Sequence, residues 1–571
     1  MFSALRIAVL ALIAMTSERA IVKSLQTQSL TRLRSINVGG SRCFRMAASS
    51  DGASDGARIL FVTPEAGAAS SFGRTSPSPR PDWITVADHL SKRIPEFDPR
   101  LRASTVASGA LPLSGGADVE RSDILLVLGV KDAGAEVAIE ELAAGWKPNP
   151  IAVLCYDCSP AVQALQRVSG YSKASDGLLQ TLRESAVPWG DVASGGRLSA
   201  QADLLLKRNS TEDLLYALFF ILHRYVINLD LVKHTLNPTW EKGPVRNAQE
   251  FANMCSTCGN QIASALTDPE TKATIDKLNA CDMCDQVGSY RVIVSYETPQ
   301  LEAFSLCILQ QNNCFNCDAE IISTPRVPLL KRWRGDYVDQ KVANQIFIGH
   351  FDCPDAHPQG SRLPWSWKVV CGANPAYDAF PCQHLISYPS DKSKSALWYD
   401  PVFKVETLDG RQVWTKRHYR CMPRKVDSDL RAEGDSSAGA WTLTTLDNGV
   451  LSKEHWTTVD VADDLSWAVF HYSGAAAVVG QSYLGALLCS VDGKWPESAS
   501  SGPEFERIVA AFEKCSIAMW ELYGHGPPGG ESFMWNDEQI AWSARNPPPL
   551  EPIGDVTIQA WRSSEKEKVA A

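Results

Sequence analysis

Three features are missing from this sequence of 571 residues, and each absence narrows the functions to consider. Basic residues are not in excess: the net charge of −10 argues against a nucleic-acid partner, because phosphate binding needs a basic surface. The strongest apolar run, LLYALFFIL at 214–222, is too short to cross a membrane and predicts a buried helix. No G-x-G-x-x-G motif follows a strand-like run, so the sequence does not predict a dinucleotide site.

The length and composition predict a globular protein of several domains, since the chain is too long for one ordinary core. Its first 50 residues differ from the rest. The apolar run IAVLALIAM (7–15) has the length of a signal-peptide core, and residues 21–50 hold five Lys or Arg and no acid. This pattern over residues 1–50 predicts a signal/transit presequence, typical of a plastid that is reached through the secretory route. A plain signal peptide with a disordered leader is the alternative.

Residues 58–235 predict an α/β domain. The short apolar runs RILFVTP, DILLVLG and IAVLCYDC alternate with helix-like stretches such as WITVADHLSKRI and EVAIEELAAGW. Such alternation is typical of parallel βαβ units. Cys155 and Cys158 follow the third run with C-x-x-C spacing, which indicates either a redox pair or two cysteines that are close by chance. The sequence indicates no role for the domain as a whole.

Seven of the 16 cysteines gather in residues 250–320. This density predicts either a disulfide framework in an oxidising compartment or a metal site in a reducing one. Two C-x-x-C pairs have the spacing of a four-thiolate zinc site. The further cysteines and the export-type presequence favour disulfides without a metal, although the pairing is not given by the sequence. The seven candidates are Cys255, Cys258, Cys281, Cys284, Cys307, Cys314 and Cys317.

Residues 330–525 predict an eight-stranded antiparallel β-barrel. Eight strand-like runs follow one another from WSWKVVCG to SYLGALLCS, and turn signals such as Asp447-Asn448-Gly449 fall between them. The stretch PEFERIVAAFEKCSIAMWELY predicts a helix after the barrel. A barrel of this size followed by one helix is the lipocalin plan, and its interior holds one small apolar ligand. Residues 540–571 predict a flexible tail.

Residues 250–525 resemble the violaxanthin de-epoxidase family, most closely its violaxanthin de-epoxidase-related subgroup. The resemblance rests on SLCILQQNNCFNCDA (305–319), WSWKVVCGANPAYDAFPCQ (365–383) and LDNGVLSKEHWTTVDVADDLSWAVFHYSG (446–474). It implies a xanthophyll-cycle oxidoreductase that uses ascorbate to remove the epoxide oxygen of a violaxanthin-type carotenoid. It also implies disulfides in the cysteine-rich domain and a plastid location, in the thylakoid lumen or on its membrane. The partners would be xanthophyll and thylakoid lipid, with peripheral membrane association.

Epoxide removal needs a carboxylic acid that keeps its proton, because the oxygen is a poor leaving group until it is protonated. An acid among aromatic side chains meets this need, since an apolar surround raises its pKa. The resemblance assigns a catalytic role to Asp378 and Tyr472. It assigns substrate binding to Tyr377, Gln383, Trp456 and Tyr483. A purely structural reading is also open: Asp378 can cap the turn at Asn374-Pro375, and the tyrosines can simply pack the barrel.

The sequence departs from the family pattern at several site positions. The family has an aspartate just before a barrel tryptophan, and this chain has His455 there, preceded by Glu454. Both are candidate catalytic residues, although a shift of one position in a strand turns a side chain to the other face. Pro381 replaces a second loop acid, and Leu385 and Tyr388 replace two acid-sensing histidines. These departures favour an alternative: a non-catalytic lipocalin that binds a carotenoid or lipid in the plastid.

Overall fold

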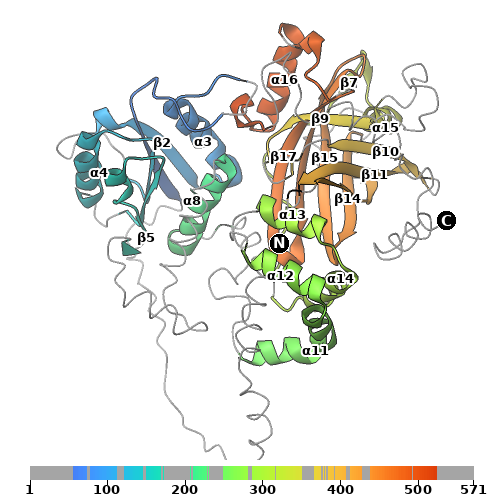
Figure 1. Cartoon of the computed structure of the whole chain (residues 1–571). Helices are drawn as coiled ribbons and strands as arrows, with labels where there is room; N and C mark the ends of the chain where they lie inside the picture. The colour runs from blue at the N-terminus through green and yellow to red at the C-terminus, as the bar shows by residue number, and fades with distance from the viewer. Residues whose placement is uncertain are drawn as a thin grey trace, which may run out of the picture.

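The computed structural model describes most of residues 56–172, 210–229 and 248–523, with longer internal gaps at 112–120, 281–285, 350–365 and 427–437. In these ranges the chain forms an α/β sheet, a group of helices and an antiparallel barrel (Figure 1). The presequence expected at 1–50 and the tail expected at 540–571 lie outside the described residues. No helix within the described ranges is both long and apolar enough to span a membrane.

The predicted α/β domain is confirmed, with helices packed against a mostly parallel sheet (Figure 1). The strand order is β2-β1-β3-β4-β5-β6, and β4 to β6 pair in antiparallel fashion. The apolar run at 214–222 lies in α8, which is buried against the sheet. The strands are β1 (Ala57–Thr63), β2 (Leu101–Ala107), β3 (Ile124–Leu128), β4 (Ala152–Tyr156), β5 (Arg167–Val168) and β6 (Tyr171–Ser172). The helices are α3 (Trp83–Phe97), α4 (Ala133–Gly145), α5 (Pro160–Gln163) and α8 (Thr211–Tyr225).

The cysteine-rich region is helical. Its elements are α11 (Ala248–Thr267), α12 (Pro269–Ala280), α13 (Gln286–Ser295), α14 (Pro299–Ser305) and a π-helical turn, η3 (Leu306–Gln311). A disulfide joins Cys258 to Cys307, with their Cα atoms 5.9 Å apart. Cys258 is therefore not available as a thiolate ligand of a four-cysteine zinc site.

Of the other candidate disulfide cysteines, some differ from the prediction and two lie outside the described residues. Cys255 and Cys314 are free thiols, contrary to the expected framework. Cys317 is buried, and its sulfur lies 3.9 Å from the Phe315 carbonyl oxygen. Cys281 and Cys284 lie outside the described residues.

The predicted eight-stranded barrel is confirmed, and Figure 1 shows its strands from the side. The sheet has nine strands, but β12 and β13 pair with successive parts of β11 and together form one side of the ring. Strand β10 pairs with both β9 and β11, which closes the barrel. The strands are β9 (Ser366–Gly372), β10 (His384–Ser390), β11 (Ser393–Glu406), β12 (Gln412–Lys416), β13 (Tyr419–Pro423), β14 (Ala440–Asp447), β15 (Val450–Val461), β16 (Trp467–Ala476) and β17 (Gln481–Ser490). A short hairpin, β7 (Arg332–Trp333) and β8 (Asp336–Tyr337), precedes it.

The Asn-Gly turn signal marks a two-residue hairpin between β14 and β15. Asp447 pairs with Val450, and the residues between them, Asn448 and Gly449, both have positive φ (49° and 76°). This is the backbone of a type I′ turn, whose twist matches that of the strands it joins.

The two ends of the barrel are covered by different helices (Figure 1). Helix α15 (Gln340–Ile348) closes one end: Phe347 packs on Trp441 at 4.3 Å between ring centroids, and the Trp367 indole donates to the Ile346 carbonyl at 2.8 Å. At the other end α13 packs against β11 and β12. The barrel interior is therefore bounded by aromatic rings on one side and by the cysteine-rich region on the other.

Helix α16 (Pro503–Lys514) packs on the outer face of β15 and β16. The sequence predicts one helix through residue 523, but the structure ends it at Lys514 because Ser516 adopts a left-handed φ of 57°. The chain then turns to the α/β domain. Trp520 packs against Phe72, and Glu521 accepts a hydrogen bond from buried Arg93 at 3.3 Å. This segment joins the barrel to the α/β domain.

Replacing both Cys258 and Cys307 by serine is expected to destabilise the helical region by about 4 kcal/mol, because the bond closes a loop of 49 residues. Hydrogen exchange of α11 and α14 in the native state measures the change. The control is Cys255→Ser on the same helix, whose free thiol is expected to matter by less than about 0.5 kcal/mol. Equal protection in the two variants would contradict a stabilising disulfide.

Candidate functional site

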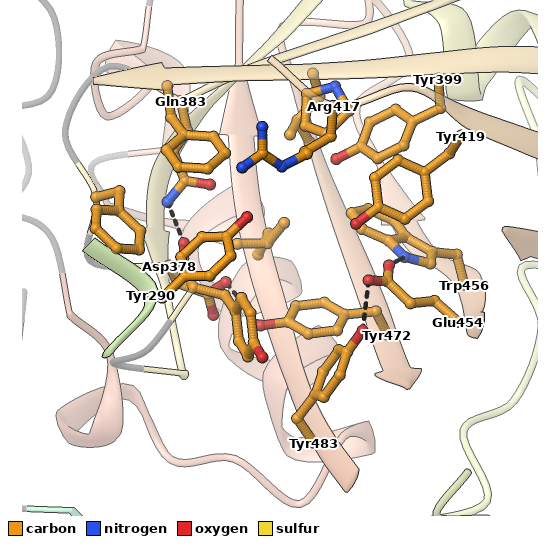
Figure 2. A pocket seen from close by; sticks show the side chains of 16 residues that line it. Tyr290, Asp378, Gln383, Tyr399, Arg417, Tyr419, Glu454, Trp456, Tyr472 and Tyr483 are labelled. Carbon is orange, nitrogen blue, oxygen red and sulfur yellow. Dashed lines mark hydrogen bonds between the residues drawn. The ribbon is translucent and has the colours of Figure 1, made fainter. Parts of the chain in front are cut away.

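A cavity of about 70 Å3 lies inside the barrel, between its strands and α13 (Figure 2). Its volume is enough for a few water molecules or part of an organic ring. Seven of the eight predicted site residues line it: Tyr377, Asp378, Gln383, Glu454, Trp456, Tyr472 and Tyr483. The eighth, His455, is not among the lining residues.

Asp378 lies in the loop after β9 and is only 2% exposed. The Asn374 amide donates to its Oδ2 at 2.7 Å, and the Tyr472 hydroxyl donates to its Oδ1 at 2.7 Å. The structural and functional interpretations of this acid therefore both hold in part, since it caps the turn and also lines the cavity. Burial raises the pKa of Asp378 to about 7, against the lowering effect of the Asn374 and Tyr472 hydrogen bonds.

Glu454 is the second acid of the cavity. Residues two apart on a strand share a face, so Glu454 points inward together with Trp456. The Trp456 indole donates to Glu454 Oε2 at 2.7 Å, and the Tyr483 hydroxyl donates to Oε1 at 2.8 Å. Burial raises the pKa of Glu454 despite these hydrogen bonds.

His455 alternates with these two residues and lies on the opposite face of β15. Burial, followed by the charges of Arg424 and Lys453, lowers the pKa of His455 to about 4. The sequence offered Glu454 and His455 as alternatives and expected a one-position shift to turn Glu454 away. In the structure Glu454 lines the cavity, whereas His455 does not.

Glycines on the neighbouring strands leave space for the rings of Tyr472 and Tyr483. Tyr472 on β16 is paired with Gly485 on β17, and Tyr483 on β17 is paired with Gly474 on β16. A Cβ atom at Gly485 would lie 2.5 Å from the Tyr472 hydroxyl, and one at Gly474 would lie 2.5 Å from the Tyr483 ring. Each ring can therefore lie across the neighbouring strand and bring its hydroxyl to a carboxyl group. Gly372 gives Asp378 similar room.

The substrate-binding candidates Tyr377 and Gln383 come from the β9–β10 connection, and they are joined by a hydrogen bond. The Gln383 amide donates to the Tyr377 carbonyl at 2.6 Å. The Tyr377 ring stacks obliquely on Tyr483, with centroids 4.7 Å apart. The loop is thereby attached to the barrel wall on both sides of Asp378.

The sequence did not indicate four polar residues of the cavity: Tyr290, Tyr399, Arg417 and Tyr419. Tyr399 and Tyr419 face each other across β11 and β13, and strand alternation could have found them. Tyr290 comes from α13 and packs near Tyr377 and Phe403, with centroids 5.7 and 6.0 Å away. No pattern within the barrel sequence points to a residue supplied by another region.

Arg417 puts a positive charge on the cavity wall. It forms ion pairs with Asp447 at 2.9 Å and with Glu297, which follows α13, at 2.8 Å. Burial alone would lower the pKa of Arg417, but these carboxylates outweigh burial and raise it well above its usual value. Among the residues that the structure describes, no group of three His, Cys, Asp or Glu is arranged to hold a metal ion.

The arrangement is suited to proton transfer in an apolar space. Figure 2 shows both acids beside tyrosine hydroxyls that point into the cavity. A tyrosine hydroxyl donates to an ionised carboxylate and accepts from a protonated one, so Tyr472 can accompany either state of Asp378. The aromatic walls suit an apolar ligand, and the hydroxyls and Arg417 suit a small polar one.

Three comparisons relate the chain to known proteins. The VDE lipocalin domain model matches residues 250–519. No curated protein matches the chain. Two solved structures, apocrustacyanin C1 and lobster apocrustacyanin A1, are each 12% identical and cover 36% of this chain and 92% of their own, with TM-scores of 0.19 and 0.18. Similarity at this level carries no functional argument.

The domain match covers the helical cysteine-rich region, the barrel and α16, and it includes every residue that lines the cavity. Residues 250–519 therefore form a VDE lipocalin domain, and this match supports membership of the violaxanthin de-epoxidase family.

Proposed function

We propose that this protein reduces the epoxide of a violaxanthin-type carotenoid to an alkene, with ascorbate as the electron donor. The observation that carries the proposal is the presence of two buried carboxyl groups, Asp378 and Glu454, in one aromatic cavity. The family match supports a carotenoid-related lipocalin, and the acids supply the proton chemistry that an epoxide requires.

The reaction balances without a metal or a bound cofactor. The ascorbate anion gives two electrons and one proton and becomes dehydroascorbate, and the second proton comes from the medium through the acids of the site. The epoxide loses its oxygen as water and becomes an alkene. The site must therefore move two protons to one oxygen and hold ascorbate beside it. Tyrosine hydroxyls and the Arg417 guanidinium are the groups in the cavity that suit an anionic enediol.

Asp378 is the proposed proton donor. A pKa near 7 means that the carboxyl keeps its proton in an acid compartment, such as the one expected for a thylakoid lumen protein. Its ionised form, left after transfer, is stabilised by the Asn374 amide and the Tyr472 hydroxyl. Glu454, held by Trp456 and Tyr483, is the proposed source or acceptor of the second proton.

The alternative function is a carotenoid- or lipid-binding lipocalin without catalysis. One observation favours it: Leu385 and Tyr388 stand where the family has two histidines. Leu385 lines the cavity, and Tyr388 is buried outside it, with its hydroxyl bonded to Asp400 at 3.2 Å. Purified protein with violaxanthin, ascorbate and galactolipid separates the two functions. Pigment binding without product would support the alternative.

Asp378→Asn and Glu454→Gln are each expected to lower the rate of de-epoxidation about 10²- to 10⁴-fold, the usual contribution of a positioned acid. Pigment binding should change little, because the side-chain volumes are kept. Absorbance of the product reports the rate. Quenching of the protein's tryptophan fluorescence by the pigment reports binding. His455→Gln is the matched control on the opposite face of β15 and should retain near-normal turnover. A loss in His455→Gln as large as that in Glu454→Gln would contradict the assignment.

The rate should fall as the pH rises through about 7, because Asp378 then loses the proton that it must donate. The Tyr472 hydrogen bond favours the ionised form, so Tyr472→Phe should move this limb of the profile to higher pH. The measurement is kcat/KM against pH in both proteins. A limb that stays in place in Tyr472→Phe would assign the titration to another group.

A further inference from the structure

The proposed reaction leaves one chemically reactive feature of the α/β domain unused. Cys155 lies in β4, and Cys158 follows directly after the strand. Between them Asp157 adopts a left-handed φ of 51°, which turns the chain sharply. The turn brings both side chains to one apolar cluster, in which Cys155 is buried and Cys158 packs against it, and each thiol shifts the pKa of the other. The C-x-x-C spacing is therefore matched by a contact in space.

The two cysteines differ in their surroundings. Cys155 is only 1% exposed, whereas Cys158 is partly exposed. The Cys155 thiol lies near the Val162 carbonyl at 3.2 Å, inside the core. Cys158 lies beside the end of β3, where its thiol can donate to the Val127 carbonyl at 3.4 Å. A reagent can thus reach one sulfur and not the other.

The same surroundings favour ionisation at Cys158. The hydrogen bond with Cys155 lowers the pKa of Cys158 most, and the backbone N–H groups of Val130 and Gly129 also lower it. The same contact, followed by burial, raises the pKa of Cys155. A partly exposed thiol of lowered pKa beside a buried thiol is the arrangement that thiol–disulfide exchange uses, with one sulfur to attack and one to resolve.

The loop that carries the pair is anchored. Tyr156, which follows Cys155, packs on Phe72 with stacked rings 5.5 Å apart and meets Trp83 edge-on at 5.9 Å. The Gly129 amide donates to the Tyr156 carbonyl at 2.8 Å. Sheets of this kind place functional groups at the carboxyl ends of their parallel strands, which is where β3 and β4 end here.

We propose that Cys155 and Cys158 form a redox-active dithiol that reduces small disulfides. The Cys158 thiolate attacks one sulfur of the substrate disulfide, forms a mixed disulfide and releases one thiol. Cys155 then gives up its proton and attacks the Cys158 sulfur, which releases the second thiol. The protein ends with a Cys155–Cys158 disulfide, and the substrate ends as two thiols, so electrons and protons balance. The activity is independent of the barrel reaction.

The test uses the purified full chain and oxidised glutathione as the probe. After exposure, free thiols are blocked with an alkylating reagent, and the peptide that carries both cysteines is examined by mass spectrometry. The wild-type chain should form the Cys155–Cys158 disulfide reversibly. Cys155→Ser should stop at a mixed disulfide between Cys158 and glutathione, and Cys158→Ser should leave Cys155 unmodified. A pair that remains as two thiols while the protein is folded would overturn the proposal.

An internal comparison keeps the result clear even if a variant folds poorly. Cys255 is a partly exposed free thiol of the same chain, and burial raises its pKa. At pH 7 the wild-type Cys158 should be alkylated faster than Cys255, because the thiolate is the reactive form and the pKa is lowered at Cys158 and raised at Cys255. Equal or slower alkylation of Cys158 would mean that the pair is a buried structural feature.

Discussion

The proposed chemistry of this protein depends on the exclusion of water from the space around two carboxyl groups. A carboxyl in contact with water ionises near its ordinary pKa and cannot deliver a proton at neutral pH. Here α15 closes one end of the barrel with Phe347 and the tryptophans around it, and Tyr290 of α13 covers the cavity from the other side. The closed ring of strands supplies the remaining walls. Barrel closure, the aromatic interior and the helical cap thus serve the same requirement.

Burial of these carboxyl groups away from water lowers the stability of the folded state at neutral pH. Asp378 has a higher pKa in the folded chain than in the unfolded one, where it lies near 3.8. The folded state therefore favours the protonated form, and the contribution of Asp378 to stability is greatest below the unfolded pKa and is lost as the pH rises through about 7. Hydrogen bonds from Asn374 and Tyr472 limit the loss by stabilising the ionised form. An acid compartment would satisfy stability and proton donation together.

Local rules predicted the strands of the barrel well. Alternating runs gave the strands, and Asn448-Gly449 gave a hairpin of the expected type, because both depend on short-range backbone preferences. Strand alternation from Trp456 alone would also have placed Glu454 inside. The resemblance instead indicated His455, which stands where the family has an aspartate before the barrel tryptophan. For a side chain on a strand, the face is set by its own alternation, and that argument is stronger than the analogy.

Other parts of the site could not be read from the barrel sequence. Tyr290 and Glu297 come from the helical region, and only the packing of α13 on β11 and β12 brings them to the cavity. The end of α16 depends on the left-handed Ser516, after which Trp520 packs in the α/β domain instead of continuing a helix. Both are tertiary effects, in which contacts between distant segments outweigh local propensity.

The helical region is therefore part of the site and not an appendage to it. Its disulfide fixes η3 to α11, and η3 in turn packs on β15, the strand that carries Glu454. Glu297 holds Arg417, and Tyr290 packs over the Asp378 loop. Loss of the Cys258–Cys307 bond would loosen this cap, admit water and return the pKa of Asp378 toward its ordinary value. In the proposed reaction the disulfide would act on proton donation through the hydration of Asp378, without contact with the substrate.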